Sequence, residues 1–251
     1  MKSEGSSSTS PADLSDAYLY CKQTTRRHAK SFYFSAQFLP QPKRQAIYAI
    51  YALCRHVDDA VDEAEAKSAH DARAAVEQWS QDLDAVYSGK KTYNPILIAW
   101  ADMLKRYAIK QELPLELMRG VLMDTYISRY KTWDDLRLYC HRVASVVGLM
   151  SSEVLGYQGP ETLKYAEALG LAMQLTNILR DVREDALMGR IYLPQEEMRK
   201  FGVTEAAVMR GEVNQSFISL MQFEISGSTI LPLKLNRESG CWTATGASPY
   251  F

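Results

Sequence analysis

Two rows of acidic side chains, each with a spacing of four residues, constrain this chain more than any other feature. Asp58 and Asp62 form the first row, and Asn177, Asp181 and Asp185 form the second. Because an α-helix has about 3.6 residues per turn, side chains four apart point to nearly the same side. A buried stripe accompanies the second row at mixed spacings of three and four: Leu171, Leu175, Ile178 and Val182. The pattern predicts two helices whose acids line a cavity.

Oxygen ligands of this kind suit a hard cation such as Mg²⁺, with Mn²⁺ as an alternative. Such an ion accepts incomplete ligation by protein when waters and substrate phosphates fill its octahedron. Arg55 lies beside the first row, and Arg180 and Arg190 lie beside the second. The planar fork of a guanidinium suits phosphate oxygens. A simpler interpretation stays open, because acids four apart are often solvated helix surface and Arg55 would then form surface ion pairs of little weight.

Several separate motifs occur in one order along the chain. The first reads Asp58-Asp59-Ala60-Val61-Asp62, the second runs from Asn177 to Asp185, and the third is Gly189-Arg190-Ile191-Tyr192-Leu193-Pro194. With these motifs the chain resembles the squalene/phytoene synthase family, the trans-isoprenyl diphosphate synthases that join two allylic diphosphates head to head. The likeness runs from about His28 to about Phe223.

The resemblance implies an all-α, isoprenoid-synthase-like helical bundle with a central apolar cavity and the two acidic rows facing each other across its mouth. It implies Mg²⁺-dependent condensation of two farnesyl or geranylgeranyl diphosphates through a cyclopropyl diphosphate. The product would be of the squalene, dehydrosqualene or phytoene type, on a route to carotenoids or hopanoids. NADPH would be used only if the product is squalene. The sequence has no G-x-G-x-x-G motif after a strand, so we expect no Rossmann site for this cofactor.

The resemblance also assigns site residues. The metal ligands would be Asp58, Asp62, Asn177, Asp181 and Asp185, and the substrate-binding residues Lys30, Ser31, Arg55, Asn177, Arg180 and Arg190. Tyr139, in a YC-x-x-VA-x-x-VG segment, joins Asp58, Asp62, Asp181 and Asp185 as a catalytic residue; its phenol would orient a leaving diphosphate or steer a carbocation. An exposed loop near Pro40 is the alternative for the segment that contains Lys30 and Ser31.

Helical patterns dominate through Phe223. We expect helices over residues 45–64, 71–87, 95–108 and 133–157, and a weaker one over 204–226. In the first of these, the predicted buried stripe consists of Ile47, Ile50, Tyr51, Cys54 and Val57. Small residues recur every four positions at Cys140, Ala144, Gly148 and Ser152, which lets another helix, or a flat prenyl chain, approach the backbone closely.

Composition predicts one globular domain. The chain has 251 residues, of which 47% are hydrophobic and 24% charged. We expect a disordered lead-in over residues 1–12, the prenyl synthase helical domain over 13–226 and an atypical tail over 227–251. The tail is rich in Gly, Pro, Ser and Thr where the family continues with further helices, so it puts activity in doubt more than fold.

Charge and cysteine usage limit partners and location. A net charge of −1 gives no electrostatic case for nucleic acid, so isoprenoid diphosphates are the expected partners. Four cysteines without a C-x-x-C pair indicate reduced thiols and a cytoplasmic location. No apolar run reaches the roughly 18 residues of a membrane span, so membrane contact would be peripheral and serve product release.

Two other functions compete. A class I terpene cyclase would act on a single diphosphate, but the YC-x-x-VA segment and the R-x-Y-L-P exit argue against it. A non-catalytic helical scaffold would be expected to show eroded acidic rows, and both rows are intact here. The atypical tail, where the family continues with helices, keeps this alternative open.

Overall fold

The computed structural model describes residues 11–65 and 68–226. The expected tail, with Cys241, lies outside the described residues, as does most of the expected lead-in. Within the described ranges the chain is helical without a β-strand, and a single isolated bridge joins Arg129 to Ile191. The all-α prediction is therefore confirmed. The elements are α1 (Pro11–His28), α2 (Lys30–Ala36), α3 (Gln41–Glu65), α4 (Ala69–Tyr87), α5 (Pro95–Met103), α6 (Glu112–Met123), α7 (Trp133–Cys140), the π-helix η1 (His141–Ser145), α8 (Val146–Leu155), α9 (Glu161–Arg180), α10 (Val182–Leu187), α11 (Gln195–Phe201), α12 (Glu205–Met209) and α13 (Gln215–Ser226).

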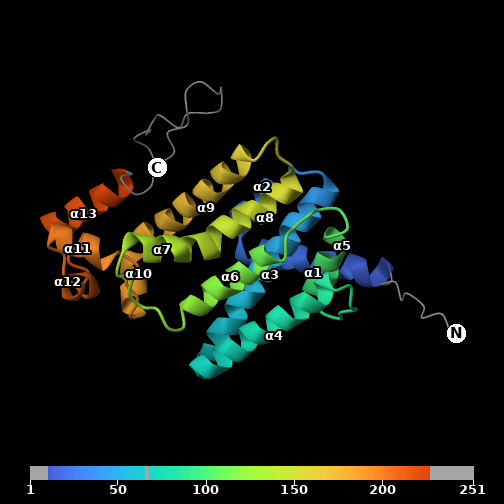
Figure 1. Cartoon of the computed structure of the whole chain (residues 1–251), viewed down its shortest axis with the longest axis horizontal. Coiled ribbons are helices and arrows are strands. Elements are labelled where there is room, and N and C mark those ends of the chain that lie inside the picture. Colours follow the sequence, from blue (N-terminus) through green and yellow to red (C-terminus); the bar gives the residue numbers. More distant parts are fainter. Residues whose placement is uncertain (1–10, 66–67, 227–251) are drawn as a thin grey trace.

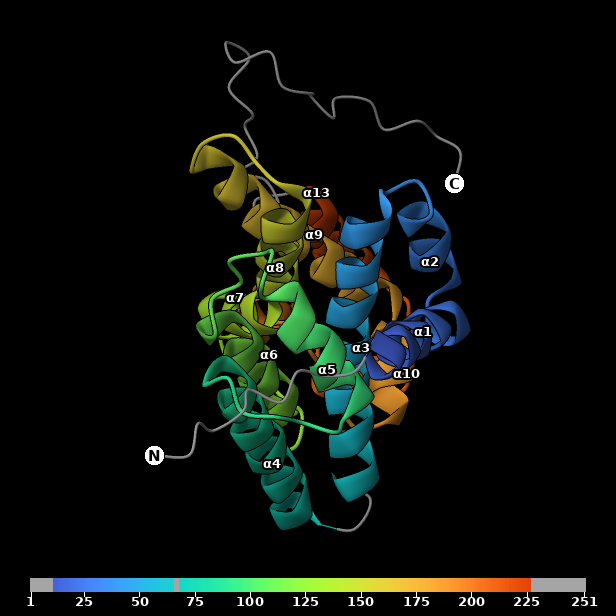
Figure 2. The same ribbon diagram turned by 90° about the vertical axis from the view of Figure 1, so that its right-hand side faces the viewer.

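The helices pack as a bundle with a smaller cluster at one end. α3 packs against α1, α4 and α5, and the α8–α9 pair lies side by side above them (Figures 1 and 2). α10 to α13 gather at one end of the long axis (Figure 1). None of the described helices is both long and apolar enough to cross a bilayer.

α3 is central because its apolar residues meet neighbours on more than one side. Ile47, Ile50 and Val57 are buried as predicted, whereas Tyr51 and Cys54 are only partly buried. The buried surface also includes Leu53 and Val61, along with the small residues Ala46, Ala49 and Ala52. Burial on this scale, at about 25 cal/mol per Å² of apolar area, fixes α3 and hence the acids on its free side.

Three of the expected helices differ from the structure. The one expected over 95–108 is α5, which ends at Met103. The expected helix over 133–157 is divided into α7, η1 and α8, because the chain widens into a π-turn after Cys140. Its last element, α8, ends at Leu155. The hydroxyl of Ser145 in this turn donates to the carbonyl oxygen of Glu167 on α9 at 2.7 Å. The expected helix over 204–226 is interrupted by Gly211, whose φ of +67° is a left-handed conformation that ends α12.

Glycines allow α9 to approach α8 and η1 closely. A β-carbon built on Gly148 would lie 2.7 Å from the carbonyl oxygen of Ala166, and one on Gly170 would lie 2.6 Å from Cα of Ser145. The small-residue row at Gly148 therefore serves helix packing.

Two glutamates are buried where α11 meets α13. Glu197 is 8% exposed and Glu224 is 2% exposed, and they are hydrogen-bonded to each other. One oxygen of each, Oε2 of Glu197 and Oε1 of Glu224, is buried without a hydrogen-bond partner among the described residues.

Candidate active site

The first acidic row lies on the second half of α3. Asp58 and Asp62 are one turn apart, and the guanidinium of Arg55 contacts Asp58 at 3.5 Å. Arg55 also pairs closely with Asp59. Arg55 therefore neutralises part of the row in the free protein and stays within reach of an incoming anion, since its side chain is 35% exposed.

Asp58 has the electrostatics of a crowded acidic site. Burial, followed by the neighbouring charge of Asp62, raises its pKa to about 6. Arg55 opposes this rise, and Asp124 contributes to it. Negative charge at this end of α3 is thus only partly compensated, which favours the arrival of a cation.

The second row spans a break between two helices. α9 ends at Arg180, Asp181 adopts φ −101° and ψ 13°, and α10 begins at Val182. The row nevertheless stays aligned, because the Asp181 N–H donates to the Asn177 carbonyl and the Asp185 N–H donates to the Asp181 carbonyl, each at 2.9 Å. The prediction of a single helix is wrong at Asp181, while the four-residue register survives.

Within this row the two aspartates differ. Arg180 binds Asp181 through two hydrogen bonds, Nε to Oδ1 at 2.7 Å and Nη2 to Oδ2 at 2.5 Å, and lowers its pKa. Burial, followed by the charge of Asp181, raises the pKa of Asp185 to about 6, against the opposing charge of Arg190. Asp185 therefore resembles Asp58 in its environment, and Arg190 is the cation that faces it.

Asp124, at the end of α6, is a site residue that the sequence did not reveal. Burial raises its pKa, and hydrogen bonds from Tyr192 and Tyr139 together with the charge of Arg190 oppose that rise. Asp62 also acts on it electrostatically. Asp124 thus connects the first acidic row with Arg190 in the exit from the second.

Tyr139 lies in a cluster of three aromatic rings next to Asp124. Its ring centroid is 5.2 Å from that of Tyr192 and 5.5 Å from that of Tyr130. All three rings are at least nine-tenths buried. Burial raises the pKa of each of the three phenols, so the hydroxyls are protonated over the physiological range.

Lys30 and Ser31 lie away from these interactions. They begin α2, and both are exposed. The next residue, Phe32, packs against Tyr51 on α3 with ring centroids 5.7 Å apart, one turn before Arg55. The segment is a helix start rather than the alternative loop, and its contact with substrate stays a prediction.

The donor set fits a hard cation that shares its shell with substrate. No three carboxylate, histidine or cysteine groups in the described ranges lie close enough together to hold a metal by themselves. The predicted ligands are all carboxylate or amide oxygens. Burial, followed by neighbouring negative charge, raises the pKa of one carboxylate in each row, Asp58 and Asp185. These properties suit Mg²⁺, which retains waters and binds phosphate oxygens.

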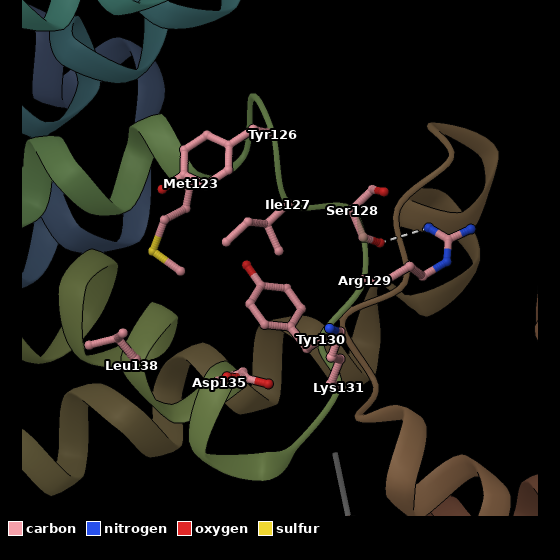
Figure 3. Close-up of a pocket in the computed structure, with 9 residues that line it drawn as sticks. All are labelled: Met123, Tyr126, Ile127, Ser128, Arg129, Tyr130, Lys131, Asp135 and Leu138. Carbon is pink, nitrogen blue, oxygen red and sulfur yellow. Dashed lines mark hydrogen bonds between the residues drawn. The ribbon is translucent and has the colours of Figure 1, made fainter.

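A separate cavity of about 440 Å³ lies beside the loop that joins α6 to α7. Figure 3 shows Met123, Ile127 and Tyr130 projecting toward the same space, with Leu138 and Asp135 of α7 at its edge. None of the predicted site residues lines this cavity. Tyr130 forms part of its wall, so the cavity borders the tyrosine cluster.

Comparison with known proteins gives consistent matches. A model of the squalene/phytoene synthase family matches residues 25–228. The phytoene synthase of Arthrospira platensis is 41% identical over 228 residues, which are 86% of this chain and 73% of that protein. The 15-cis-phytoene synthase of Synechococcus elongatus is 40% identical over 226 residues, 85% of this chain and 72% of that protein.

Solved structures show the same fold. A dehydrosqualene synthase in complex with ligand superposes with a TM-score of 0.78 at 32% identity, covering 86% of this chain and 74% of that one. The squalene synthase HpnC from Alicyclobacillus acidocaldarius superposes with a TM-score of 0.79 at 28% identity, covering 86% of this chain and 81% of that one.

Proposed function

Because the chain belongs to the squalene/phytoene synthase family and is therefore a prenyltransferase, we propose that it condenses two allylic isoprenoid diphosphates head to head in a Mg²⁺-dependent reaction. The observation that supports this proposal best is the pairing of charges. A carboxylate row with an arginine lies on α3, and another lies across α9 and α10.

In this proposal the chain's residues divide the work. Asp58, Asp62, Asn177, Asp181 and Asp185 would hold Mg²⁺, which when bound neutralises charge on the departing diphosphate. Arg55 and Arg190 bind diphosphate oxygens, and Arg180 does so on releasing Asp181. Lys30 and Ser31 extend this binding surface from the start of α2.

The reaction itself occurs between the two substrates. The C–O bond of one allylic diphosphate breaks, giving diphosphate and an allylic cation. The double bond of the second substrate attacks that cation, and loss of a proton closes a cyclopropyl diphosphate. Burial around Tyr139 and Tyr192 keeps this region dry, which protects the cation from water.

We propose a phytoene-type product from geranylgeranyl diphosphate, formed without NADPH. The proteins of 40–41% identity are named phytoene synthases, whereas the dehydrosqualene and squalene synthases match at 32% and 28%. Residues 13–226 form the catalytic domain in this proposal. Peripheral membrane contact would release the hydrocarbon product.

A product assay tests the function. The purified chain is incubated with geranylgeranyl or farnesyl diphosphate and Mg²⁺, with and without NADPH, and the products are identified by mass spectrometry. We expect phytoene from geranylgeranyl diphosphate, unaffected by NADPH and abolished by excess EDTA. A cyclised product from one diphosphate would favour the terpene cyclase, and no turnover of either substrate would favour the scaffold.

A further inference from the structure

Asp124 accepts a hydrogen bond on each carboxylate oxygen from a tyrosine. The hydroxyl of Tyr139 donates to Oδ2 at 2.9 Å, and the hydroxyl of Tyr192 donates to Oδ1 at 2.8 Å. The three residues come from the end of α6, from α7 and from the segment after α10, so the carboxylate ties together three parts of the chain. Hydrogen bonds of this charge-assisted kind are stronger than neutral ones.

The rings are held in place independently of these bonds. Tyr130, which is 1% exposed, stacks on Tyr192 with centroids 5.6 Å apart and an interplanar angle of 20°. Tyr139 is 5% exposed and contacts both other rings. Packing of this kind fixes each ring and the position of its oxygen, so the only freedom left to the hydroxyl is rotation of its proton about the C–O bond.

The direction of the Tyr139 hydrogen bond limits what this residue can do. A phenol has one O–H proton, and the proton of Tyr139 points at Asp124. While this bond is made, the proton is not available to a departing diphosphate. The phenol retains the lone pairs of its oxygen and the face of its ring, and donation to a carboxylate makes both more electron-rich. Such a group stabilises positive charge.

We propose that Asp124 is a positioning residue that fixes the hydroxyls of Tyr139 and Tyr192, so that Tyr139 offers electron density to a developing allylic cation instead of a proton to the leaving diphosphate. From the sequence, Tyr139 could orient the leaving diphosphate or steer a carbocation. The hydrogen bond to Asp124 favours the second role. The proposal rests on the proposed head-to-head condensation for the cation, but the hydrogen-bond arrangement is a property of the free protein.

Nuclear magnetic resonance of the protein labelled at Cζ of tyrosine tests the arrangement without substrate. Loss of one signal in Tyr139→Phe identifies the Tyr139 resonance. In the near-isosteric Asp124→Asn variant we expect this resonance to move upfield, because an amide oxygen is a weaker acceptor than a carboxylate. Asp124→Glu should retain most of the wild-type shift, and Asp134→Asn, an exposed change on α7, should not move it. An unchanged Tyr139 resonance in Asp124→Asn would overturn the proposal.

Kinetics test the role. We expect Asp124→Asn to lower kcat by about 10- to 100-fold, which is the worth of a hydrogen bond to a charged group, with KM changed less than about twofold. Asp124→Glu should recover part of kcat. Wild-type kcat in a folded Asp124→Asn variant would refute the positioning role. If the wild-type chain converts no diphosphate, the proposed function fails, and the resonance data still decide whether Tyr139 donates to Asp124.

Discussion

Arg190 donates its backbone N–H to the carbonyl oxygen of Asp185 at 2.9 Å, so the exit segment is tied to the second acidic row. The charge of its side chain acts on both Asp185 and Asp124. One arginine therefore serves carboxylates from two different parts of the fold. Replacement of the Arg190 guanidinium should therefore alter the electrostatic environment of both carboxylates.

Lysine should not replace the site arginines. We predict that Arg55→Lys and Arg190→Lys each lower kcat/KM by about tenfold or more, because an ammonium group is a point charge without the bidentate fork. Steady-state assays with geranylgeranyl diphosphate measure this. The matched control is Arg137→Lys, at an exposed pair with Asp134 on α7, which should leave kcat/KM unchanged. Wild-type kinetics in both site variants would contradict the prediction.

Removal of one carboxylate from either row should severely reduce turnover. We predict that Asp62→Ala and Asp181→Ala each reduce turnover by several powers of ten, since charge stabilisation by a bound cation is worth several kcal/mol of barrier. Calorimetric titration with Mg²⁺ and inorganic diphosphate should show weaker binding in both. Asp16→Ala on the exposed side of α1 is the control. Full activity in the presence of excess EDTA would show that the metal assignment is wrong.

The glutamate pair between α11 and α13 predicts a pH dependence of stability. Burial, and then the hydrogen bond to Glu197, raises the pKa of Glu224 well above its ordinary range. The folded protein holds a proton here that the unfolded chain releases above about pH 4.3, so the free energy of unfolding should fall as pH rises from there. Glu224 is the only charged residue of α13, and Lys200, which faces α13, lies over the Phe223 ring at 4.2 Å.

We expect Glu224→Gln to remove this dependence and to stabilise the protein by about 1–3 kcal/mol at pH 8, because a neutral amide needs no proton to be buried. Urea unfolding at pH 5 to 9 measures it. Glu77→Gln, an exposed change on α4, should follow the wild type. Parallel curves for the wild type and Glu224→Gln would contradict the prediction.

Apolar side chains on the surface predict a gain from additional helices. Leu169 and Met173 on α9 are 58% and 61% exposed, and Ile225 on α13 is 63% exposed. We predict that joining the remaining C-terminal segment of the Arthrospira platensis enzyme after residue 226 raises both Tm and turnover, since each 1 kcal/mol gained is worth about 2–4 °C in a domain of this size. A glycine- and serine-rich segment of equal length should do neither. If the 251-residue chain equalled this fusion in Tm and activity, the prediction would be wrong.

Helix periodicity was sufficient to predict an all-α chain and to put Asp58 and Asp62 one turn apart on one helix. The spacing of Ile47, Ile50 and Val57 predicted α3 and its buried side, because one face of a helix repeats regularly along the sequence. The break at Asp181 was not predictable, since the four-residue register on either side is unaffected by it.

Contacts between distant segments set the remaining features. Asp124 stands alone in the sequence, and its tyrosine partners are 15 and 68 positions away. The π-turn after Cys140 accompanies packing against α9 at Gly170. Neither feature leaves a local pattern, so the tertiary structure was needed to find them.

The glycine contacts of α9 fix the distance between this helix and its neighbours α8 and η1. Backbone meets backbone at Gly148 and Gly170, with no side chain between that could be shortened or lengthened. The helix that carries Asn177 therefore keeps its position when other residues change. A side chain at either glycine would press on the facing backbone, so neither position accepts a larger residue without a shift of α9. Sequence drift elsewhere on α9, for example at the exposed Met173, can therefore proceed without moving the helix that carries Asn177.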